Sequence, residues 1–262
     1  MLDYELIDYG KGLKFERFGS KKLIRPEGSV QKQPKNPIFS WKEDSACRSQ
    51  GTRHFEWDPP LEPWVIEYDG LKLELRVTNS KNIGVFPEQE ANWQWLAKKV
   101  QPGMKILNLF AYTGAATMIC ARAGAEVCHV DASKGAVRWA SDNAKLSGLG
   151  EMPIRWIVED AMAFLRREAT RGRTYDGVIL DPPPFGKADA DNFLFKRDIG
   201  ELLGACKRVL PEHPKLFLLN SYAMNLEPED LRDLVARHFK GEKIETGELK
   251  VGDLALSTYA RF

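Results

Sequence analysis

The sequence predicts an α/β protein with a mostly parallel seven-stranded sheet, an antiparallel C-terminal hairpin, and a small N-terminal β-rich domain. Two observations lead to this fold class. Between about residues 105 and 239, short apolar runs alternate with segments of helical periodicity, which is the pattern of right-handed βαβ units. After residue 239, two β-like segments follow each other without an intervening helix, which predicts a hairpin at the edge of the sheet.

The composition is that of an ordinary globular protein. Of 262 residues, 43% are hydrophobic and 29% charged, with a formal net charge of +1 that predicts neither nucleic-acid nor membrane binding. No apolar stretch is long enough to span a bilayer and no signal-peptide core is present, so we expect a cytoplasmic protein with no membrane partner. The four cysteines lack CxxC spacing, so we expect neither a disulfide framework nor a bound metal.

Residues 1–84 are predicted to form the β-rich domain, for which substrate recognition is our hypothesis. Alternation of apolar and charged residues predicts a hairpin over residues 64–77, turning at Asp69-Gly70. A strand is expected over residues 2–7, and the proline-rich and tryptophan-rich stretch 31–64 is expected to be loop-like.

The second predicted domain covers residues 85–262. It begins with a helix over residues 88–100, started by Pro87 and ended before Pro102. The seven predicted strands cover residues 105–110, 126–130, 154–158, 176–181, 215–220, 243–250 and 254–261. The predicted helices between them cover residues 114–123, 133–146, 160–169, 193–210 and 227–239. This order predicts a Rossmann-like sheet with helices on both faces.

Polar residues gather where these strands end, and ligands of open parallel sheets bind at that edge. The first strand leads into a turn at Gly114, the second ends at Asp131, and the fourth ends at Asp181. An acid after the second strand suits a ribose, and Asp160 after the third could accept from an adenine amino group. A dinucleotide cradle requires three glycines, whereas the first loop has only Gly114. A sulfonium cofactor such as S-adenosylmethionine needs no such cradle.

Four segments occur together in an order that resembles the class I S-adenosylmethionine-dependent methyltransferases: Asn108–Gly114, His129–Ser133, Glu159–Ala161 and Asp181–Gly186. The resemblance extends to the branch that contains large-subunit ribosomal RNA methyltransferases, which also carries a stretch like Gly84–Trp93 before the loop that ends at Gly114. The likeness covers about residues 80–262. Each motif alone is weak, but the set is specific.

The resemblance implies a set of cofactor contacts. These are Phe86, Glu88, Gln89, Asn92, Asn108, Phe110, Ala111, Tyr112, Thr113, Gly114, Asp131, Ala132, Ser133, Asp160, Ala161 and Asp181. Simpler roles stay open for several of them. Asp131 and Asp160 could each cap the helix that follows, and residues 86–92 could be ordinary surface and packing positions.

The loop from Asp181 to Phe185 is expected to carry the chemistry. Its three consecutive prolines fix φ and lack N–H donors, so the loop is stiff and its carbonyls are available as acceptors. Asp181 and a carbonyl of Pro182 or Pro183 would orient an attacking nitrogen, and Phe185 would stack on a planar base. The alternative is a loop that only closes the sheet.

The positions of the cysteines indicate which kind of atom accepts the methyl group. Carbon-5 methylation of cytosine needs a covalent cysteine, which in that class of enzymes lies in the fourth-strand loop or at the end of the fifth strand. Those positions here, Pro182–Pro184 and Leu219–Tyr222, contain none. We therefore expect methylation of a base nitrogen of RNA, with ribosomal RNA as the expected substrate (class EC 2.1.1). The alternatives are a cofactor-binding assembly factor without transfer activity and a methyltransferase of a small molecule or protein.

Several basic residues are candidates for phosphate contacts, and Lys187, directly after the proline loop, is the first choice. The others are Lys21, Lys22, Arg25, Lys32, Lys35, Arg48, Arg53, Lys196 and Arg197. The sequence leaves the oligomeric state open.

Overall fold

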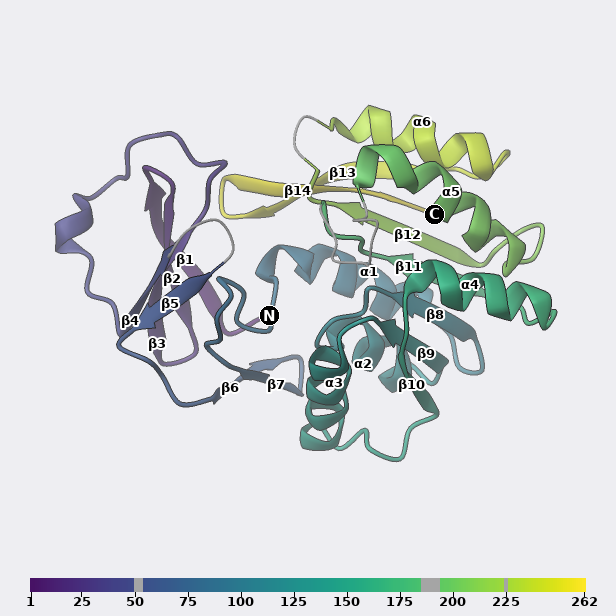
Figure 1. The fold of residues 1–262 in the computed structure, drawn as a ribbon, viewed down its shortest axis with the longest axis horizontal. Helices are drawn as coiled ribbons and strands as arrows, with labels where there is room; N and C mark the ends of the chain where they lie inside the picture. The colour runs from purple at the N-terminus through teal and green to yellow at the C-terminus, as the bar shows by residue number, and fades with distance from the viewer. Residues whose placement is uncertain (50–53, 185–193, 224–225) are drawn as a thin grey trace. The chain divides into compact units, whose positions relative to one another are not determined.

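The computed structural model describes residues 1–49, 54–184, 194–223 and 226–262, and the chain divides into two compact units (Figure 1). The first unit comprises Met1–Glu90 with Val251–Leu254, and the second comprises Ala91–Lys250 with Ala255–Phe262. Among the helices in these described ranges, none has the length and apolar character needed to cross a bilayer.

The first unit is built from a five-stranded sheet in the order β1-β2-β3-β4-β5 and a separate β6-β7 hairpin. The strands are β1 (Tyr4–Gly10), β2 (Leu13–Phe18), β3 (Lys21–Pro26), β4 (Ser45–Ser49), β5 (Phe55–Asp58), β6 (Trp64–Tyr68) and β7 (Leu71–Leu75). β1, β2 and β3 form an antiparallel meander, whereas β4 runs parallel to β3. The predicted hairpin turns at Asp69-Gly70, where both residues have positive φ.

The prediction that residues 31–64 are loop-like is wrong in part, because β4 and β5 lie within this range and pair antiparallel. Cys47 and Trp57 face each other across the pair, and both are buried. The segment before β4 is irregular, apart from a 3-10 helix, η1 (Ile38–Ser40). The Asp8 carboxylate holds that segment through the backbone N–H of Lys35 and of Asn36, at 3.0 and 2.8 Å.

The second unit confirms the predicted α/β class. Its seven strands follow the order β10-β9-β8-β11-β12-β14-β13, and β14 runs antiparallel to β12. The strands are β8 (Lys105–Leu109), β9 (Glu126–Asp131), β10 (Ile154–Val158), β11 (Gly177–Leu180), β12 (Leu216–Ser221), β13 (Glu245–Val251) and β14 (Leu254–Arg261). The helices are η2 (Pro87–Gln89, in the first unit), α1 (Glu90–Lys99), α2 (Ala115–Arg122), α3 (Lys134–Leu146), α4 (Ala161–Thr170), α5 (Phe195–Arg208) and α6 (Pro228–His238).

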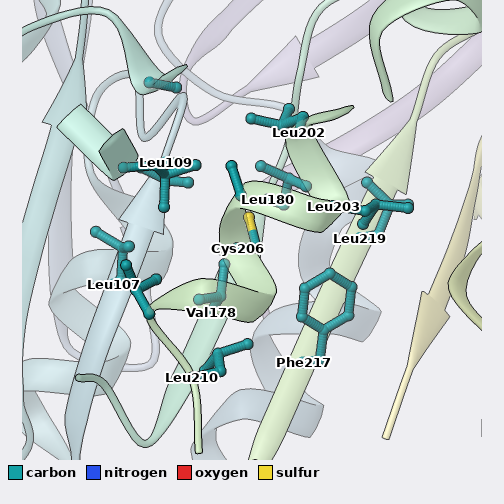
Figure 2. Packing of buried hydrophobic residues seen from close by; sticks show 14 of the residues in the cluster. Leu107, Leu109, Val178, Leu180, Leu202, Leu203, Cys206, Leu210, Phe217 and Leu219 are labelled. Carbon is teal, nitrogen blue, oxygen red and sulfur yellow. The ribbon is translucent and has the colours of Figure 1, made fainter. Parts of the chain in front are cut away.

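A large apolar core covers one face of this sheet. Successive side chains of a strand point to opposite faces, so Leu107 and Leu109 enter the core while Asn108 points to the other side. Figure 2 shows the packing of strand residues against α5, with these members labelled: Leu107, Leu109, Val178, Leu180, Leu202, Leu203, Cys206, Leu210, Phe217 and Leu219. The helices α4, α5 and α6 lie side by side over this face, and α2 lies on the Asn108 side (Figure 1).

Strand register brings the carboxyl ends of β9, β8 and β11 to one edge. Leu109 of β8 pairs with Val130 of β9 on one side and with Leu180 of β11 on the other. The next residues along these strands, Phe110, Asp131 and Asp181, therefore lie in neighbouring positions at that edge.

Candidate active site

Two carboxylates flank the loop that follows β8. Asp131 ends β9 and Asp181 follows β11, with β8 between them. Because neighbouring strands lie about 5 Å apart, the two residues are separated by about 10 Å across the sheet edge. The loop between them, residues 110–114, has the position that a ligand of an open parallel sheet occupies.

This loop has an unusual backbone conformation. Phe110 and Tyr112 have φ of 55° and 47°, in the left-handed region that residues with a Cβ rarely adopt, and Gly114 has φ of 87°. At Gly114 a Cβ would lie 2.9 Å from the Cβ of Ala140 on α3, so only glycine fits. Left-handed conformations at two non-glycine residues cost about 1–3 kcal/mol each, so other contacts have to hold them.

Polar groups from β9 and α3 provide those contacts. The Tyr112 backbone N–H donates to Asp131 Oδ2 at 2.9 Å, and the Ser133 N–H donates to Asp131 Oδ1 at 2.8 Å. From α3, Asn143 Nδ2 donates to the Thr113 carbonyl at 3.0 Å. Burial raises the pKa of Asp131, and its two N–H donors offset only part of that effect. Asn143 carries no sequence signal for this role, because it lies 30 residues away on a helix.

A buried chain of side chains lies beneath the loop. Asn108 Nδ2 donates to Thr117 Oγ1 at 2.9 Å, and Thr117 Oγ1 is 2.9 Å from His129 Nδ1. Since Thr117 accepts from the amide, its hydroxyl proton is directed to Nδ1, which places the imidazole proton on Nε2. The Asn108 side chain is thus hydrogen-bonded to Thr117 beneath the loop, and the residue is only 2% exposed. A contact between Asn108 and the cofactor stays a prediction, and neither Thr117 nor His129 was expected here.

The His129 imidazole should make stability depend on pH. Burial lowers the pKa of His129 from 6.5 to about 3, and the Tyr112 backbone acts weakly in the opposite direction. Between these two values the unfolded chain binds a proton that the folded chain does not, so stability is lost as pH falls below about 6.5. Each pH unit lost is expected to cost up to about 1.4 kcal/mol of unfolding free energy.

The measurement compares denaturant unfolding of the native chain and His129→Asn at pH 7 and pH 5. Asparagine keeps an acceptor for Thr117 but does not titrate. Stability of the variant should therefore fall less between the two pH values than that of the native chain. The same pH dependence in both proteins would show that His129 does not carry this linkage.

Two predicted cofactor contacts are helix caps in the structure. The Ser133 hydroxyl accepts from the Ala136 N–H at 3.2 Å and caps α3, while Asp160 accepts from the Ala163 N–H at 2.9 Å and caps α4. Ala161 is 4% exposed and packs in the apolar core. Ala132 is exposed beside Asp131. A contact between these four residues and the cofactor stays a prediction.

The predicted catalytic loop begins with Asp181, whose carboxylate is hydrogen-bonded to a neighbouring strand. Asn220 Nδ2, at the end of β12, donates to Asp181 Oδ1 at 2.7 Å. Pro182 is buried and Pro183 is half-buried, and the Pro184 carbonyl accepts from the Phe195 N–H at 3.4 Å. The predicted stacking residue Phe185 and the phosphate candidate Lys187 lie outside the described residues.

The predicted cofactor contacts among residues 86–92 belong to different units. Phe86, Glu88 and Gln89 belong to the first unit, around η2, where Glu88 and Gln89 are buried. Asn92 lies on α1 in the second unit and is 1% exposed. Its Oδ1 accepts from Arg261 Nη1 at 3.1 Å. Their contact with the cofactor stays a prediction.

All four thiols of the chain are buried. Cys47 is in β4, Cys120 in α2, Cys128 in β9 and Cys206 in α5. Burial raises the pKa of Cys47 and Cys128 to about 11 and that of Cys120 and Cys206 to about 12. A nucleophilic cysteine requires the opposite conditions, namely exposure and a lowered pKa.

Arg25, one of the phosphate candidates, has another role. Its Nε and Nη2 donate to the two carboxylate oxygens of Glu16 at 2.7 and 2.9 Å, and Arg25 is only 5% exposed. Burial alone would raise the pKa of Glu16, but the charges of Arg25 and Lys14 lower it to about 2. The prediction of a phosphate contact at Arg25 is therefore wrong. Arg53 lies outside the described residues.

The residues at the sheet edge fit S-adenosylmethionine. Each Asp131 oxygen accepts one backbone N–H and retains acceptor capacity for a ribose hydroxyl. The loop of residues 110–114 leads directly into α2, and the N-terminus of a helix provides backbone N–H groups for a ligand at this edge. In the described ranges, no cluster of three or more histidine, cysteine, aspartate or glutamate side chains could hold a metal ion.

Comparisons with known proteins agree with this geometry. A family model described as S-adenosylmethionine-dependent methyltransferase matches residues 37–240. A methyltransferase structure from Agrobacterium tumefaciens is 35% identical, covers 99% of this chain and 90% of its own, and superimposes with a TM-score of 0.89.

Two curated relatives carry ribosomal RNA names. Ribosomal RNA large subunit methyltransferase I of Aeromonas salmonicida is 31% identical over 75% of this chain and 47% of its own length. Ribosomal RNA large subunit methyltransferase K/L of Shewanella baltica is 31% identical over 78% of this chain and 29% of its own length. The chain thus spans half or less of the length of these two relatives. With the family model matching most of its residues, the chain belongs to the S-adenosylmethionine-dependent methyltransferases.

Proposed function

We propose that the protein methylates a nitrogen of an RNA base, with ribosomal RNA as substrate and without a covalent cysteine. The observation that carries the proposal is the Asp181 carboxylate, held by Asn220 beside the cofactor loop and followed directly by three prolines. The two relatives named as large-subunit ribosomal RNA methyltransferases support RNA as the substrate class.

The cofactor supplies a methyl group that is already activated for transfer, so the residues of the chain contribute binding and alignment. Asp131 would accept both ribose hydroxyls. Asp160, beyond β10, would accept from the adenine amino group, and Tyr112 and Thr113 would lie at the methionine end. These assignments follow the order of the strand ends along the sheet edge.

Asp181 would act on the attacking nitrogen. An amino group that donates an N–H to this carboxylate has its lone pair held in one direction, and a proline carbonyl provides a second acceptor. A neutral nitrogen that gains a methyl group becomes cationic and must lose a proton, for which the same carboxylate is an acceptor. The stiffness of the proline run keeps these acceptors in place.

Single replacement of each cysteine by alanine tests the absence of a covalent step. Each variant is expected to lose about 1 kcal/mol of stability from the small cavity and to keep its methyl-transfer rate. Rates are measured with folded protein at saturating cofactor, and denaturant unfolding gives the stability. A variant that is folded and binds cofactor normally, yet transfers no methyl group, would contradict the proposal.

The direct test of substrate class uses cofactor labelled in its methyl group. The protein is incubated separately with undermodified ribosomal RNA, with a protein extract and with a pool of small metabolites. We expect label in the RNA, and its loss with Asp181→Ala. Label only in the protein extract or in the metabolite pool would contradict RNA as the substrate. Cofactor binding without transfer to any pool would favour a binding or assembly factor.

A further inference from the structure

Asp181 belongs to a chain of three side chains from neighbouring strands. Asn220, at the end of β12, donates from Nδ2 to Asp181 Oδ1 at 2.7 Å, and Ser257 Oγ on β14 lies 3.2 Å from Asn220 Oδ1. Asn220 and Ser257 are 1% and 7% exposed. Asp181 directly follows β11, whereas Asn220 lies in β12 and Ser257 in β14, and these three strands are neighbours in the sheet.

The chemistry of the three groups determines the direction of each hydrogen bond. An ionised carboxylate can only accept, so the Asn220 amide must present its NH₂ group to Asp181. Its carbonyl oxygen then faces Ser257, whose hydroxyl can donate to it. The Asp181 carboxylate therefore sets the orientation of the amide, and the Ser257 hydroxyl holds the amide in it by donating to the carbonyl oxygen. With the opposite orientation, two oxygens would face each other at the Asp181 side.

The sheet makes this chain rigid. Asn220 pairs with Tyr259 in the β12–β14 ladder, two residues from Ser257, so backbone hydrogen bonds fix the spacing of both residues. β11 and β12 are in parallel register up to Leu180 and Leu219, directly before Asp181 and Asn220. The amide of Asn220 thus connects the Asp181 carboxylate, at the start of the proline loop, to β12 and β14.

We propose that Asn220 and Ser257 are positioning residues for methyl transfer: Ser257 orients the Asn220 amide, and Asn220 orients the Asp181 carboxylate toward the acceptor nitrogen. The inference rests on the proposed function, because it assigns Asp181 the same role. Neither residue would touch substrate or cofactor. Both act through Asp181, so their removal should affect the rate of transfer and spare cofactor binding.

The test measures single-turnover methyl transfer to undermodified ribosomal RNA, the KM for RNA and the cofactor Kd. Asn220→Leu, which keeps a similar volume, is expected to lower the rate about 10-fold to 100-fold with little change in the cofactor Kd or KM. Ser257→Ala should lower it less, because the amide keeps its contact with Asp181 in part of the population. Ser257→Thr keeps the hydroxyl and should restore the native rate.

A double variant separates positioning from general support of the fold. If Asn220 acts through Asp181, then Asn220→Leu should lower the rate little further in the Asp181→Ala background. Equal effects of Asn220→Leu in both backgrounds, or native rates for Asn220→Leu and Ser257→Ala, would overturn the inference. The proposed function fails separately, if the native chain methylates no RNA or if Asp181→Ala leaves the rate unchanged.

Discussion

Asp181→Ala is expected to lower the rate of methyl transfer about 100-fold or more while cofactor affinity stays close to the native value. The reason is that a misaligned nucleophile loses most of the advantage of being bound next to an activated methyl group. Asp181 follows the last residue of β11, and its Oδ1 is fixed by Asn220 at 2.7 Å. Removal of the carboxylate takes away the acceptor and leaves the adjoining sheet intact.

Two further variants sharpen this result. Asp181→Asn keeps an acceptor oxygen and removes the negative charge, so an intermediate rate indicates orientation of the nitrogen, whereas a rate as low as that of Asp181→Ala indicates proton acceptance. Asp176→Asn is the matched control, since Asp176 precedes the opposite end of the same strand and binds the Lys105 N–H. Its transfer rate should stay native. A native rate for Asp181→Ala would remove the central residue from the mechanism.

Asp131→Ala is expected to have the largest effect on cofactor binding, a rise in Kd of about 100-fold or more. Hydrogen bonds to a charged group contribute about 1.5–3 kcal/mol each, and the proposed ribose contact has two of them. In the native chain the Tyr112 N–H donates to the Asp131 carboxylate at 2.9 Å. The replacement removes this hydrogen bond from a loop with strained backbone angles. Isothermal titration with S-adenosylmethionine measures the change.

The control for Asp131→Ala is Asp233→Ala, an exposed aspartate on α6 that pairs with Arg232. It should bind cofactor like the native chain. Far-UV circular dichroism and the unfolding midpoint show whether Asp131→Ala remains folded. A folded Asp131→Ala with native affinity would show that the ribose does not bind at the end of β9.

The sequence was informative where the signal is local. Short apolar runs between helical segments predicted all seven strands of the second sheet. The signal is strongest for β8, β9, β11 and β12, which are buried along most of their length and are rich in apolar residues. The same reasoning placed Asp131 and Asp181 at one edge, since parallel strands end together. It failed for β4 and β5, which are short, lie among prolines and depend on partners elsewhere in the first sheet.

The contacts that organise the site are non-local and left no pattern in the sequence. Asn220 and Ser257 are 37 positions apart, and Thr117 and His129 meet only because α2 packs on β8 and β9. Positive φ at Phe110 and Tyr112 could not be expected either, because neither residue type favours it. Arg25 was mispredicted for the same reason. Nothing in the sequence indicates that this basic residue is paired with Glu16, nine positions away.

Identification of the methylated atom tests the proposed nitrogen methylation most directly. Ribosomal RNA from cells with and without the gene, and from the labelled reaction in vitro, is digested to nucleosides and compared by mass spectrometry. We expect a base methylated on nitrogen that is absent without the gene and restored by the native chain, with Asp181→Ala restoring far less. A 5-methylpyrimidine as the only gene-dependent product would contradict it, because that product requires a covalent nucleophile and the four thiols are buried in the fold.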